Sequence, residues 1–449
     1  MLSLEQSIKR GQAHVAVIGL GYVGLPLAVE FARVGFPTVG VDTDARRVAA
    51  INRGESYIPD VPNPQLGEVI ASGKLKATVD YDVLSAVDVV FICVPTPFTA
   101  TKAPDISSVV TAAEGIAQRL RPGQLIVLQS TTHPGTTEED VLPILERSGL
   151  RGGHDFHLAF SPERTNPGDR QFTVANTPKV VGGLTSRCTE LARSLLTTIT
   201  PEVHALSSPR AAEMTKLLEN IFRSVNIALV NELAKLAERM GIDIWEVIEA
   251  ASTKPFGFMP FYPGAGVGGH CIPVDPYYLS WKAREYDFYT KFIEFAAEVN
   301  QSMPYHLVGK VVEALNLHGK PLRGSRLLIL GVAFKRDIDD PRNSPAERVI
   351  ELLLDGGASV LYNDPYVPRL SVGHDVFYRE NPLLESQPLT DELIASVDCV
   401  VIVTGHTAYD YQRIVATAKA VVDSCNATKN VAERSDKVIR VGAPRRTEA

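Results

Sequence analysis

Short apolar runs alternate with amphipathic stretches over the first 206 residues of the chain. The runs VAVIG, TVGVD, DVVFICVP and LIVLQS, and the weaker HLAFSP, are typical of buried strands. Helical periodicity fills the intervals between them, as in LPLAVEFARVG. Buried strands that alternate with helices predict a parallel, doubly wound sheet in a first domain of residues 1–206.

The pattern changes at Ser207. The stretch SPRAAEMTKLLENIFRSVNIALVNELAKLAERMG predicts one long helix, with Pro209 near its start and Gly241 closing it. DIWEVIEAAS and the stretch from Tyr289 to about Asn316 predict further helices, and no strand pattern intervenes. We therefore expect residues 207–318 to form an all-helical middle domain.

Strand and helix patterns alternate again after residue 318. SRLLILGVAF, ASVLYNDP, CVVIVTG and AVVDSC predict a second, smaller parallel sheet in residues 319–449. The predicted fold class is therefore α/β, with two Rossmann-like parallel-sheet domains joined by a central helical segment.

The composition fits this three-part organisation. The chain has 449 residues, of which 45% are hydrophobic and 22% charged, as in a soluble globular protein of two or three domains. A net charge of −7 without any basic block argues against nucleic acid as a partner. No apolar run is long enough to span a membrane, so we expect no membrane association.

The five cysteines are scattered and form no C-x-x-C pair: Cys93, Cys188, Cys271, Cys399 and Cys425. An odd, scattered set favours reduced thiols in the cytoplasm and argues against both a disulfide frame and structural zinc. We expect no metal site. Cys93 and Cys399 stand within apolar runs and fit the interpretation of small buried side chains.

The first strand leads into a dinucleotide-binding pattern. Gly19, Gly21 and Gly24 form G-x-G-x-x-G between the first predicted strand and its helix. The first glycine permits the tight turn, the second lets the backbone approach a pyrophosphate, and the third permits close helix–strand packing. Asp42 ends the second strand, where an acid binds the adenosine ribose, so NAD is favoured over NADP. Arg47 tempers that preference because it could accommodate a phosphate.

Polar residues follow the later strands of the first sheet. Thr131 stands in QSTTHPGTT and Glu163 with Arg164 in SPERTNPG, each after a predicted strand. Ligands bind at this carboxyl edge in open α/β sheets. Lys216 and Asn220 lie four residues apart on one face of the long helix, and either line a cleft or form an ordinary surface pair.

A glycine-rich run precedes one of the cysteines. In GAGVGGHCIPVDP, residues 264–276, Cys271 follows four glycines and His270 and precedes Asp275. The glycines would let a substrate approach a nucleophilic thiol, but an inert buried cysteine fits equally well. A phosphate cradle would leave the thiol unexplained. Adjacent His270 and Cys271 would be a poor metal site.

The second sheet lacks a dinucleotide pattern. Its first strand leads into GVAFKRDIDDPR. A nucleotide-binding architecture without that pattern suggests another ligand, such as a mononucleotide whose phosphates Lys335 and Arg342 could hold. A solvated charged turn explains the same residues equally well.

Several motifs together resemble the UDP-glucose/GDP-mannose dehydrogenase family. They are VIGLGYVGLPLA, VPTP, QSTTHPGTT, SPER, the Lys216–Asn220 helix, PGAGVGGHCIPVDP and FKRDIDDPRNSP, in order from about residue 14 to 440. The resemblance implies oxidation of the C6 alcohol of a nucleotide sugar to a carboxylate with two NAD. It also implies a dinucleotide domain, a dimerising helical centre, a nucleotide-sugar domain and a homodimer or higher homo-oligomer.

The resemblance implies catalytic roles for Cys271, Lys216, Asn220, Asp275, Glu163 and Thr131. Cys271 would add to the C6 aldehyde, and Lys216 with Asn220 would stabilise oxyanion charge at C6. Asp275 would orient water or activate groups beside the thiol, while Glu163 and Thr131 would serve the later hydrolysis.

The resemblance also implies two sets of binding residues. The cofactor set is Gly19, Gly21, Tyr22, Val23, Gly24, Asp42, Arg47, Pro95, Thr96, Thr131 and Arg342, the last reaching across a dimer. The substrate set is Glu163, Arg164, Lys216, Asn220, Phe261, Tyr262, Gly264, Gly268, Phe334 and Lys335.

Departures from the glucose-type pattern indicate the sugar. GGHC and SPER stand where glucose-type enzymes usually carry G-G-S-C and N-P-E-F, and with FMPFYPG they resemble the UDP-N-acetylhexosamine branch. Within it, UDP-N-acetylglucosamine is favoured, and UDP-N-acetylmannosamine is the closest competitor. Pro255 stands where glucose-type enzymes have an arginine, and His270 has no assigned role.

Two other classes of function compete with this interpretation. A two-electron dehydrogenase of the 6-phosphogluconate or β-hydroxyacid type also joins a dinucleotide sheet to a helical domain with Lys-x-x-x-Asn. Such an enzyme needs neither the thiol of Cys271 nor residues 323–440. A non-catalytic NAD-binding sensor is the alternative from a different class.

Overall fold

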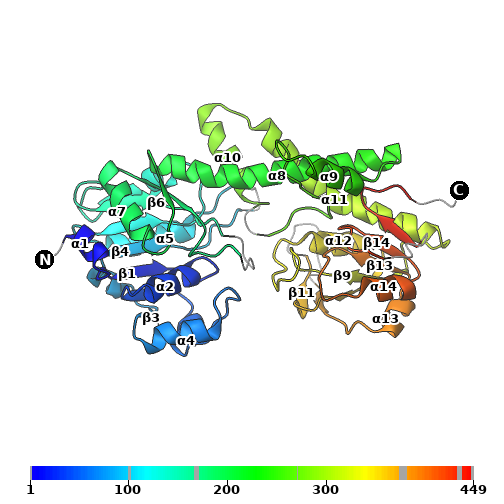
Figure 1. The fold of residues 1–449 in the computed structure, drawn as a ribbon, viewed down its shortest axis with the longest axis horizontal. Helices are drawn as coiled ribbons and strands as arrows, with labels where there is room; N and C mark the ends of the chain where they lie inside the picture. Colours follow the sequence, from blue (N-terminus) through cyan, green and yellow to red (C-terminus); the bar gives the residue numbers. More distant parts are fainter. Residues whose placement is uncertain are drawn as a thin grey trace. The chain divides into compact units, whose positions relative to one another are not determined.

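The computed structural model of the chain describes residues 3–99, 103–165, 171–269, 272–373, 382–431 and 437–445. The chain packs into two compact units. The first consists of Met1–Glu219 with Tyr277–Tyr289, and the second of Asn220–Pro276 with Thr290–Ala449. Each unit is built on a central, mostly parallel sheet (Figure 1). Among the described residues, no helix is both long enough and apolar enough to span a bilayer.

The first unit contains an eight-stranded sheet with the order β3-β2-β1-β4-β5-β6-β7-β8. Its strands are β1 Val15–Ile18, β2 Thr38–Val41, β3 Leu75–Thr78, β4 Val89–Ile92, β5 Leu125–Leu128, β6 His157–Phe160, β7 Lys179–Gly183 and β8 Val203–Leu206. The five apolar runs of the sequence became β1, β2, β4, β5 and β6, all paired in parallel.

Helices cover both faces of this sheet. They are α1 Leu4–Lys9, α2 Gly24–Arg33, α3 Ala45–Asn52, α4 Asn63–Ala71, η1 Tyr81–Ala86, α5 Ser107–Ala117, η2 Thr137–Val141, α6 Leu142–Glu146 and α7 Ser186–Leu196. Alternate residues of β1 point to opposite faces: Val15 and Val17 pack with α2, α4 and α7, while Ala16 and Ile18 pack with α5 and α6. Burial on both faces explains why the central strands are continuous apolar runs.

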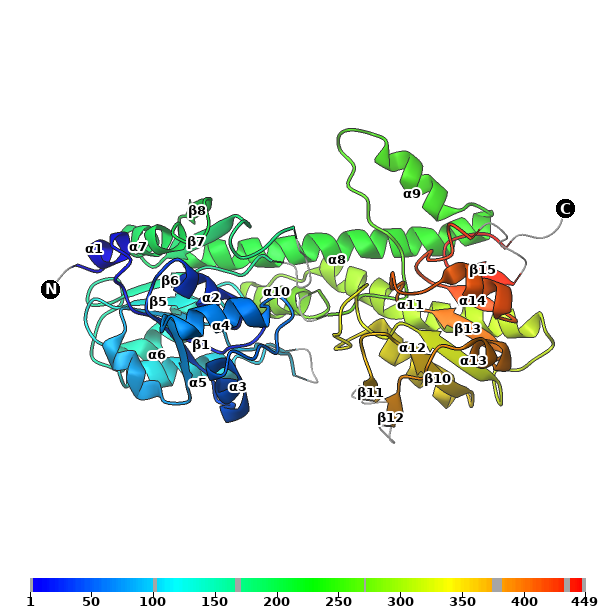
Figure 2. The ribbon, with the colours of Figure 1, turned by 60° about the horizontal axis from the view of Figure 1, so that its bottom comes forward.

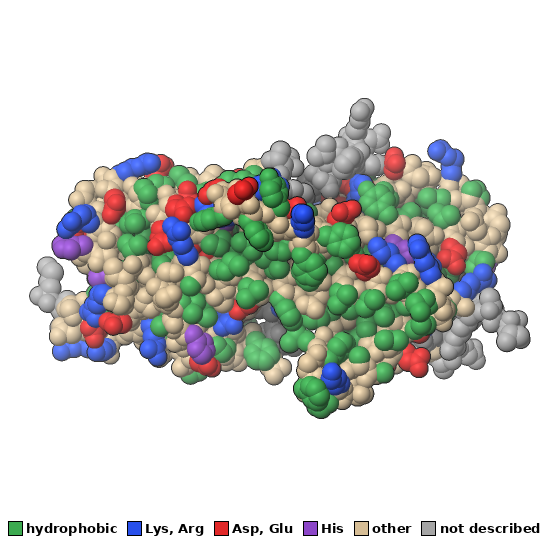
Figure 3. Space-filling view, turned by 90° about the horizontal axis from the view of Figure 1, so that it is seen from above, with side chains coloured by type: hydrophobic (Ala, Val, Ile, Leu, Met, Phe, Trp, Pro, Cys, Tyr) green, Lys and Arg blue, Asp and Glu red, His purple; other side chains and the backbone are tan. Residues whose placement is uncertain are grey.

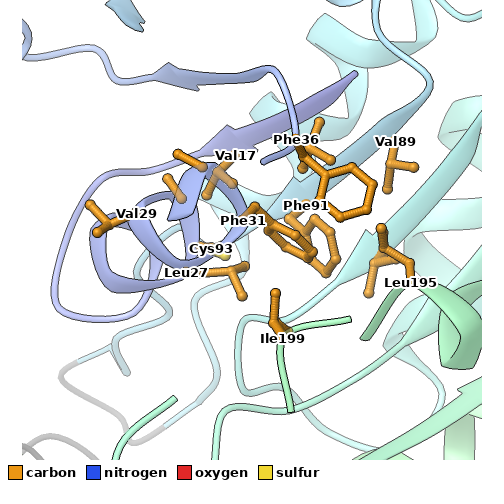
Figure 4. Packing of buried hydrophobic residues seen from close by; sticks show 14 of the residues in the cluster. Val17, Leu27, Val29, Phe31, Phe36, Val89, Phe91, Cys93, Leu195 and Ile199 are labelled. Atoms are coloured by element: carbon orange, nitrogen blue, oxygen red, sulfur yellow. The ribbon is translucent and has the colours of Figure 1, made fainter. Parts of the chain in front are cut away.

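Aromatic rings fill the core under α2. The ring centroids of Phe31 and Phe91 lie 5.2 Å apart, and Phe36 meets Phe31 edge-on at 6.0 Å (Figure 4). Cys93 is buried in the same cluster, as expected from its apolar run. This packing fixes α2 against β1 and β4, and so fixes the glycine turn that precedes the helix.

Three strands of this sheet were not predicted. β3 and β8 are the edge strands, and each is buried at only some of its positions, so neither is an apolar run. β7 ends in Gly182 and Gly183, where an added Cβ would lie 2.0 Å from Ser208 O and 2.4 Å from Thr189 N, respectively, so its apolar run is only two residues long. β7 also runs antiparallel to β6, a departure from the expected all-parallel order. The described residues between those two strands form no helix that could carry a parallel crossover.

The second unit contains the smaller sheet, with the order β10-β9-β13-β14-β15. Its strands are β9 Arg326–Leu330, β10 Ser359–Asn363, β13 Cys399–Ile402, β14 Val421–Asp423 and β15 Val438–Arg440, and β11 Arg369–Ser371 pairs antiparallel with β12 Leu383–Glu385 beside them. The five strands of the smaller sheet pair in parallel, and four of them, β9, β10, β13 and β14, arise from the predicted strand patterns. β15 and the β11–β12 pair were not predicted, because each is short and only partly buried, whereas the equally short β14 is fully buried and apolar at its first two positions.

The middle of the chain is helical, as predicted, but its residues are divided between the two units. Its elements are α8 Pro209–Met240, α9 Ile244–Ser252, α10 Asp275–Ala283, η3 Arg284–Tyr286 and α11 Lys291–Asn316 (Figure 2). Gly241, with φ 73°, ends α8 in the left-handed conformation that glycine favours. α11 packs against the smaller sheet together with α12 Pro345–Asp355, and α13 Asp391–Ser396 and α14 Tyr411–Thr417 cover its other face.

Candidate active site

The turn from β1 into α2 has the shape of a pyrophosphate cradle. Gly19 has φ 87°, and a Cβ there would lie 2.7 Å from the carbonyl oxygen of Cys93. A Cβ at Gly24 would lie only 1.8 Å from Gly19 O, whereas one at Gly21 would meet nothing within 4 Å. Gly19 and Gly24 are therefore required by the fold, whereas Gly21 leaves open space beside the N-terminus of α2. The residues present fit a dinucleotide phosphate.

Asp42 directly follows β2, beside this turn. Its carboxylate accepts backbone N–H groups of Leu20 at 2.9 Å and Asp44 at 2.9 Å, which fixes its position. The Arg47 guanidinium lies 3.7 Å from Asp42 and 5.5 Å from the ring centre of Tyr57. Arg47 is thus held beside the acid, which reduces the negative charge that a ribose or a 2′-phosphate would meet.

The ends of β4 and β5 are joined by side-chain hydrogen bonds. Thr96 Oγ1 donates to the carbonyl oxygen of Thr131 at 2.7 Å, so two predicted cofactor segments lie together. The buried Tyr278 of α10 donates to the carbonyl oxygens of Thr96 and Pro97. Tyr22 and Val23 pack against the core under α2. Pro95 lies in the segment that follows β4, directly before Thr96.

Buried polar atoms without partners lie at the same edge of the sheet. Gln129 Oε1 and Thr132 Oγ1 have no hydrogen-bond partner within the described part of the chain. Buried polar groups are normally hydrogen-bonded, so these two atoms favour a polar ligand at the carboxyl end of β5.

Several hydrogen-bond donors surround the carboxylate of Glu163. Its carboxylate accepts from Lys179 Nζ at 3.0 Å, Gln129 Nε2 at 3.1 Å, and the backbone N–H groups of Arg164 and Thr165 at 2.8 and 2.9 Å. Burial raises the pKa of Glu163, but the Lys179 charge and the hydrogen bonds outweigh it and lower the pKa to about 2. Glu163 is therefore ionised at neutral pH and carries no proton to donate.

The part of α8 that belongs to the first unit carries two charged residues of interest, Lys216 and Glu219. Arg164 forms an ion pair with Glu219, at 2.7 Å, and donates to Pro178 O at 2.7 Å. Lys216, one turn earlier, is only 8% exposed. Within the described residues its ammonium has no hydrogen bond or ion pair, which leaves it able to pair with an oxyanion.

Asn220 and Asp275 lie together, although 55 residues separate them. Asn220 Nδ2 donates to Asp275 Oδ2 at 2.5 Å, and both side chains are buried. Asp275 is the first residue of α10. The structure thus joins two of the predicted catalytic residues in the second unit, while Thr131, Glu163 and Lys216 belong to the first. Cys271 and His270 lie outside the described residues.

The glycine run before Cys271 lies directly on the second unit. Gly264 N donates to the buried Asn231 Oδ1 at 3.0 Å. A Cβ at Gly268 would lie 2.8 Å from both Asn343 O and Phe334 Cβ. Gly268 is required because the run passes there in direct contact with the β9–α12 loop, which carries Phe334.

The aromatic residues before the run have structural contacts. Phe261 packs on the cluster around Trp245, and Tyr262 stacks on Trp245 with ring centroids 5.9 Å apart. Pro255 is exposed.

The β9–α12 loop is internally braced. Arg342 forms a double ion pair with Asp340, at 2.8 and 2.7 Å, and Phe334 N donates to Asp340 O at 2.9 Å. Lys335 is partly exposed on the same loop. The predicted substrate residues Phe334 and Lys335 therefore stand on a loop of defined shape at the carboxyl end of β9.

A buried histidine missed by the sequence analysis also holds this loop. His406 Nδ1 lies 2.9 Å from the backbone N of Asp337, and its Nε2 lies 3.0 Å from Asp364 Oδ2. Since a backbone N–H only donates, Nδ1 is the acceptor, and the proton is on Nε2. Asp364 also accepts N–H groups of Val332 and Ala333. His406 directly follows the predicted strand CVVIVTG, which was the only signal for it.

Comparisons with known proteins agree with this geometry. Residues 13–200, 210–302 and 328–430 match, in order, the NAD binding, central and UDP binding domains of the UDP-glucose/GDP-mannose dehydrogenase family. The chain is 40% identical over 363 residues to a UDP-N-acetyl-D-glucosamine 6-dehydrogenase of Pseudomonas aeruginosa, covering 80% of this chain and 85% of that protein.

Two further similarities come from one organism. The chain is 36% identical over 398 residues to a UDP-N-acetyl-D-mannosamine dehydrogenase of Pyrococcus horikoshii, covering 88% of this chain and 90% of that one. A solved structure of a UDP-D-ManNAc dehydrogenase from Pyrococcus horikoshii matches 96% of this chain and 99% of its own, with a TM-score of 0.85 at 33% identity. The chain therefore belongs to the UDP-glucose/GDP-mannose dehydrogenase family and is an NAD-dependent nucleotide-sugar dehydrogenase.

Proposed function

We propose that the chain oxidises the C6 hydroxymethyl group of UDP-N-acetylglucosamine to the uronic acid, with two NAD per substrate. The carrying observation is the similarity along 80% of the chain to a UDP-N-acetyl-D-glucosamine 6-dehydrogenase, together with the sequence GGHC at the thiol. UDP-N-acetylmannosamine is the second candidate, because the relative named for that sugar is 36% identical over 88% of the chain. Both are UDP-N-acetylhexosamines.

A thiol suits a four-electron oxidation. NAD, when bound, supplies hydride acceptance in both oxidation steps. After the first, the Cys271 thiol adds to the C6 aldehyde, forming a C–S bond, and the thiol proton passes to the carbonyl oxygen. Loss of a second hydride from C6 and of the hydroxyl proton gives a thioester. Water then cleaves the C–S bond, which releases the carboxylate and restores the thiol.

The surrounding residues suit these steps. Lys216, buried and without a carboxylate partner among the described residues, would stabilise oxyanion charge at C6. Asn220 fixes the Asp275 carboxylate four residues after Cys271, where it would orient water. Glu163 would act as an ionised group during hydrolysis, since its pKa of about 2 excludes proton donation at neutral pH. Thr131 would hold the water.

Each of the three segments of the chain would have a separate binding role. Residues 1–206 would bind NAD, residues 319–449 would bind the UDP-sugar, and residues 207–318 would form the homodimer contact. The described cysteines, Cys93, Cys188, Cys399 and Cys425, are free thiols, which favours a reducing compartment such as the cytoplasm.

The stoichiometry of the reaction tests the proposal. With limiting UDP-sugar and excess NAD, we expect two NADH per sugar, and one NADH would indicate a two-electron enzyme. A panel of UDP-GlcNAc, UDP-ManNAc, UDP-GalNAc and UDP-Glc ranks the sugars by kcat/KM, and we expect UDP-GlcNAc first. Cys271→Ser should abolish the second NADH, and unchanged turnover by that variant would refute the role of the thiol.

A further inference from the structure

Tyr57 lies beside the predicted cofactor turn, although no motif of the sequence singled it out. Its hydroxyl donates to the carbonyl oxygen of Leu20 at 2.6 Å, within the turn from β1 into α2. The backbone N–H of Leu20 in turn donates to Asp42 Oδ2 at 2.9 Å. The phenol is therefore joined, through one residue of the glycine turn, to the acid that directly follows β2.

The ring of Tyr57 also holds a positive charge. The guanidinium of Arg47 lies 5.5 Å from the centre of this ring, within the range of a cation–π contact. Arg47 Nη1 lies 3.7 Å from Asp42 Oδ2. The Arg47 side chain is 49% exposed, so without the ring it could leave the carboxylate for solvent. Tyr57 thus restrains Arg47 beside Asp42.

The segment that carries Tyr57, between α3 and α4, is itself braced. The backbone N–H of Ser56 donates to Asn63 Oδ1 at 2.7 Å, and that of Ile58 donates to Ser56 Oγ at 3.1 Å. Ile58 is buried in the core under α2, against which Tyr57 also packs. Burial and the negative charge of Asp42 raise the pKa of Tyr57, so the phenol remains a donor over the usual pH range. The ring is therefore presented in a fixed place.

The charges beside this ring bear on the choice between NAD and NADP. The two cofactors differ at the 2′ position of the adenosine ribose, where NADP carries a phosphate of about −1.5 to −2 charges at pH 7. An acid after the second strand binds the ribose hydroxyls and repels that phosphate. Arg47 beside Asp42 compensates part of this repulsion. NAD has an uncharged hydroxyl at the 2′ position and depends less on the compensation.

A second arginine of α3 has a different partner. Arg46 donates to the carboxylate of Asp44 through Nε at 3.2 Å and Nη2 at 3.1 Å. Its side chain is 93% exposed. Arg46 and Arg47 therefore carry the same charge on the same helix, but Arg47 is the one that contacts Tyr57 and Asp42.

We infer that Tyr57 is a positioning residue that holds Arg47 beside Asp42 and thereby limits the discrimination of the cofactor site against NADP. The inference rests on the proposed function, in which the first domain binds NAD with Asp42 facing the adenosine ribose. Tyr57 acts through Arg47 and does not itself touch the cofactor. Its loss leaves the carboxylate of Asp42 less compensated, so that NADP binds more weakly relative to NAD.

The ratio of the NADP to the NAD dissociation constant measures this discrimination. Both constants are obtained with the full chain from the displacement of NADH, followed by its fluorescence, so no turnover is needed. Tyr57→Leu removes the ring, Tyr57→Phe removes only the hydroxyl, and Arg47→Leu removes the cation. Arg46→Leu controls for the loss of one positive charge from α3. Tyr305→Leu controls for the loss of a ring that holds an arginine, since Arg348 lies 5.3 Å from its centre in the second unit.

The unsubstituted enzyme should bind NADP measurably, though more weakly than NAD. In Tyr57→Leu we expect the ratio to rise about threefold, the effect of one cation–π contact near the surface. Arg47→Leu should raise it at least about fivefold, the Coulomb effect of one charge at short range in water. The double variant Tyr57→Leu/Arg47→Leu should match Arg47→Leu alone, because the ring acts through the guanidinium. Tyr57→Phe, Arg46→Leu and Tyr305→Leu should leave the ratio nearly unchanged.

Other outcomes overturn distinct statements. A ratio that is unchanged or lower in Tyr57→Leu refutes the inference, and so does a double variant whose ratio exceeds that of Arg47→Leu. An equal rise in Arg46→Leu and Arg47→Leu would show that net charge alone matters, which refutes the positioning. Failure of NADP to displace NADH from the unsubstituted enzyme would leave Arg47 without a compensating effect and also refutes the inference.

One further variant tests the cofactor site separately. Asp42→Asn removes the carboxylate that repels the 2′-phosphate and should lower the ratio at least about fivefold. A lowered ratio together with an unchanged ratio in Tyr57→Leu would leave the cofactor site standing and refute only the role of Tyr57. An unchanged ratio in Asp42→Asn would place the ribose away from Asp42 and refute the proposed cofactor site.

Discussion

At the scale of single residues, the pair formed by Glu163 and Lys179 combines structure and chemistry. Lys179 is 1% exposed and Glu163 is 8% exposed, so each charge depends on the other for solvation. A carboxyl group whose pKa is lower in the folded than in the unfolded chain stabilises the fold at pH values above its unfolded pKa. For Glu163 that contribution is fully present above pH 4.5 and is lost as the pH falls toward about 2. The pair is therefore stable throughout the pH range of ordinary enzyme assays.

Removing one charge of this pair should destabilise the first unit. Glu163→Gln leaves the Lys179 ammonium buried and unpaired, which should lower the free energy of unfolding by about 3–5 kcal/mol in chemical denaturation. The double variant Glu163→Gln/Lys179→Met removes both charges and should recover most of that loss. Glu55→Gln, which breaks an exposed ion pair with Arg53, is the control and should leave stability unchanged.

The same variants separate the two roles of Glu163. If Glu163 also serves hydrolysis, the double variant will be stable and will still form NADH slowly. Full activity in the double variant would show that Glu163 has a structural role only. Stability unchanged in Glu163→Gln would contradict the buried ion pair.

Residue types could be predicted from the sequence, but their partners could not. Glu163 and Asn220 were singled out by their motifs and helix positions. Lys179 was not, because a lysine at the start of KVVGG looks like a surface residue until the strand is placed beside β6. The partnership of Asn220 with Asp275 bridges 55 residues of chain and depends on tertiary packing alone.

At the scale of elements, the β1–α2 turn makes two glycines behave differently. Gly21→Ala places its Cβ in open space, so the unfolding temperature should change little. The added methyl would occupy the space of a pyrophosphate, and the NAD dissociation constant from calorimetry should rise at least about tenfold. Gly24→Ala would bring its Cβ to 1.8 Å from Gly19 O and should destabilise the fold by more than about 1 kcal/mol.

Gly67→Ala controls for the general effect of adding a methyl. It lies on α4, where a Cβ meets nothing within 4 Å, and the substitution should be neutral or slightly stabilising. Equal loss of NAD affinity in Gly67→Ala and Gly21→Ala would remove the local explanation. A stable Gly24→Ala protein would show that the turn rearranges more easily than its contacts suggest.

Central strands were predictable and edge strands were not, for one physical reason. β1, β4 and β5 are buried on both faces and so are continuous apolar runs. β3 is buried at alternate positions, and its sequence LKAT has no strong period over so few residues. α8 was predictable because Pro209 at its start and Gly241 directly after its end bound a 32-residue stretch of one helical pattern.

At the scale of the whole molecule, α8 has two unlike faces. Ala228, Val230, Ala234 and Ala237 are buried within the second unit. On other sides of the helix, large apolar side chains are exposed at Phe222, Leu229, Leu233, Leu236 and Met240. Their spacing of three, four and seven residues makes one stripe along the helix. Figure 3, which looks onto the side where α8 and α9 lie at the top of Figure 1, shows hydrophobic side chains gathered there.

An apolar stripe of this length favours a second copy of the chain as its partner, because monomeric proteins rarely expose such continuous apolar surface. Light scattering should give about twice the monomer mass of 48.8 kDa. Leu233→Glu/Leu236→Glu adds two charges to the stripe and should weaken association at least about a hundredfold, since each buried unpaired charge costs several kcal/mol. Val79→Glu replaces an equally exposed apolar residue outside α8 and should leave the mass unchanged. A dimer that survives the double substitution would place the contact between copies on another surface. A monomer in the unsubstituted protein would leave the stripe without the partner proposed for it.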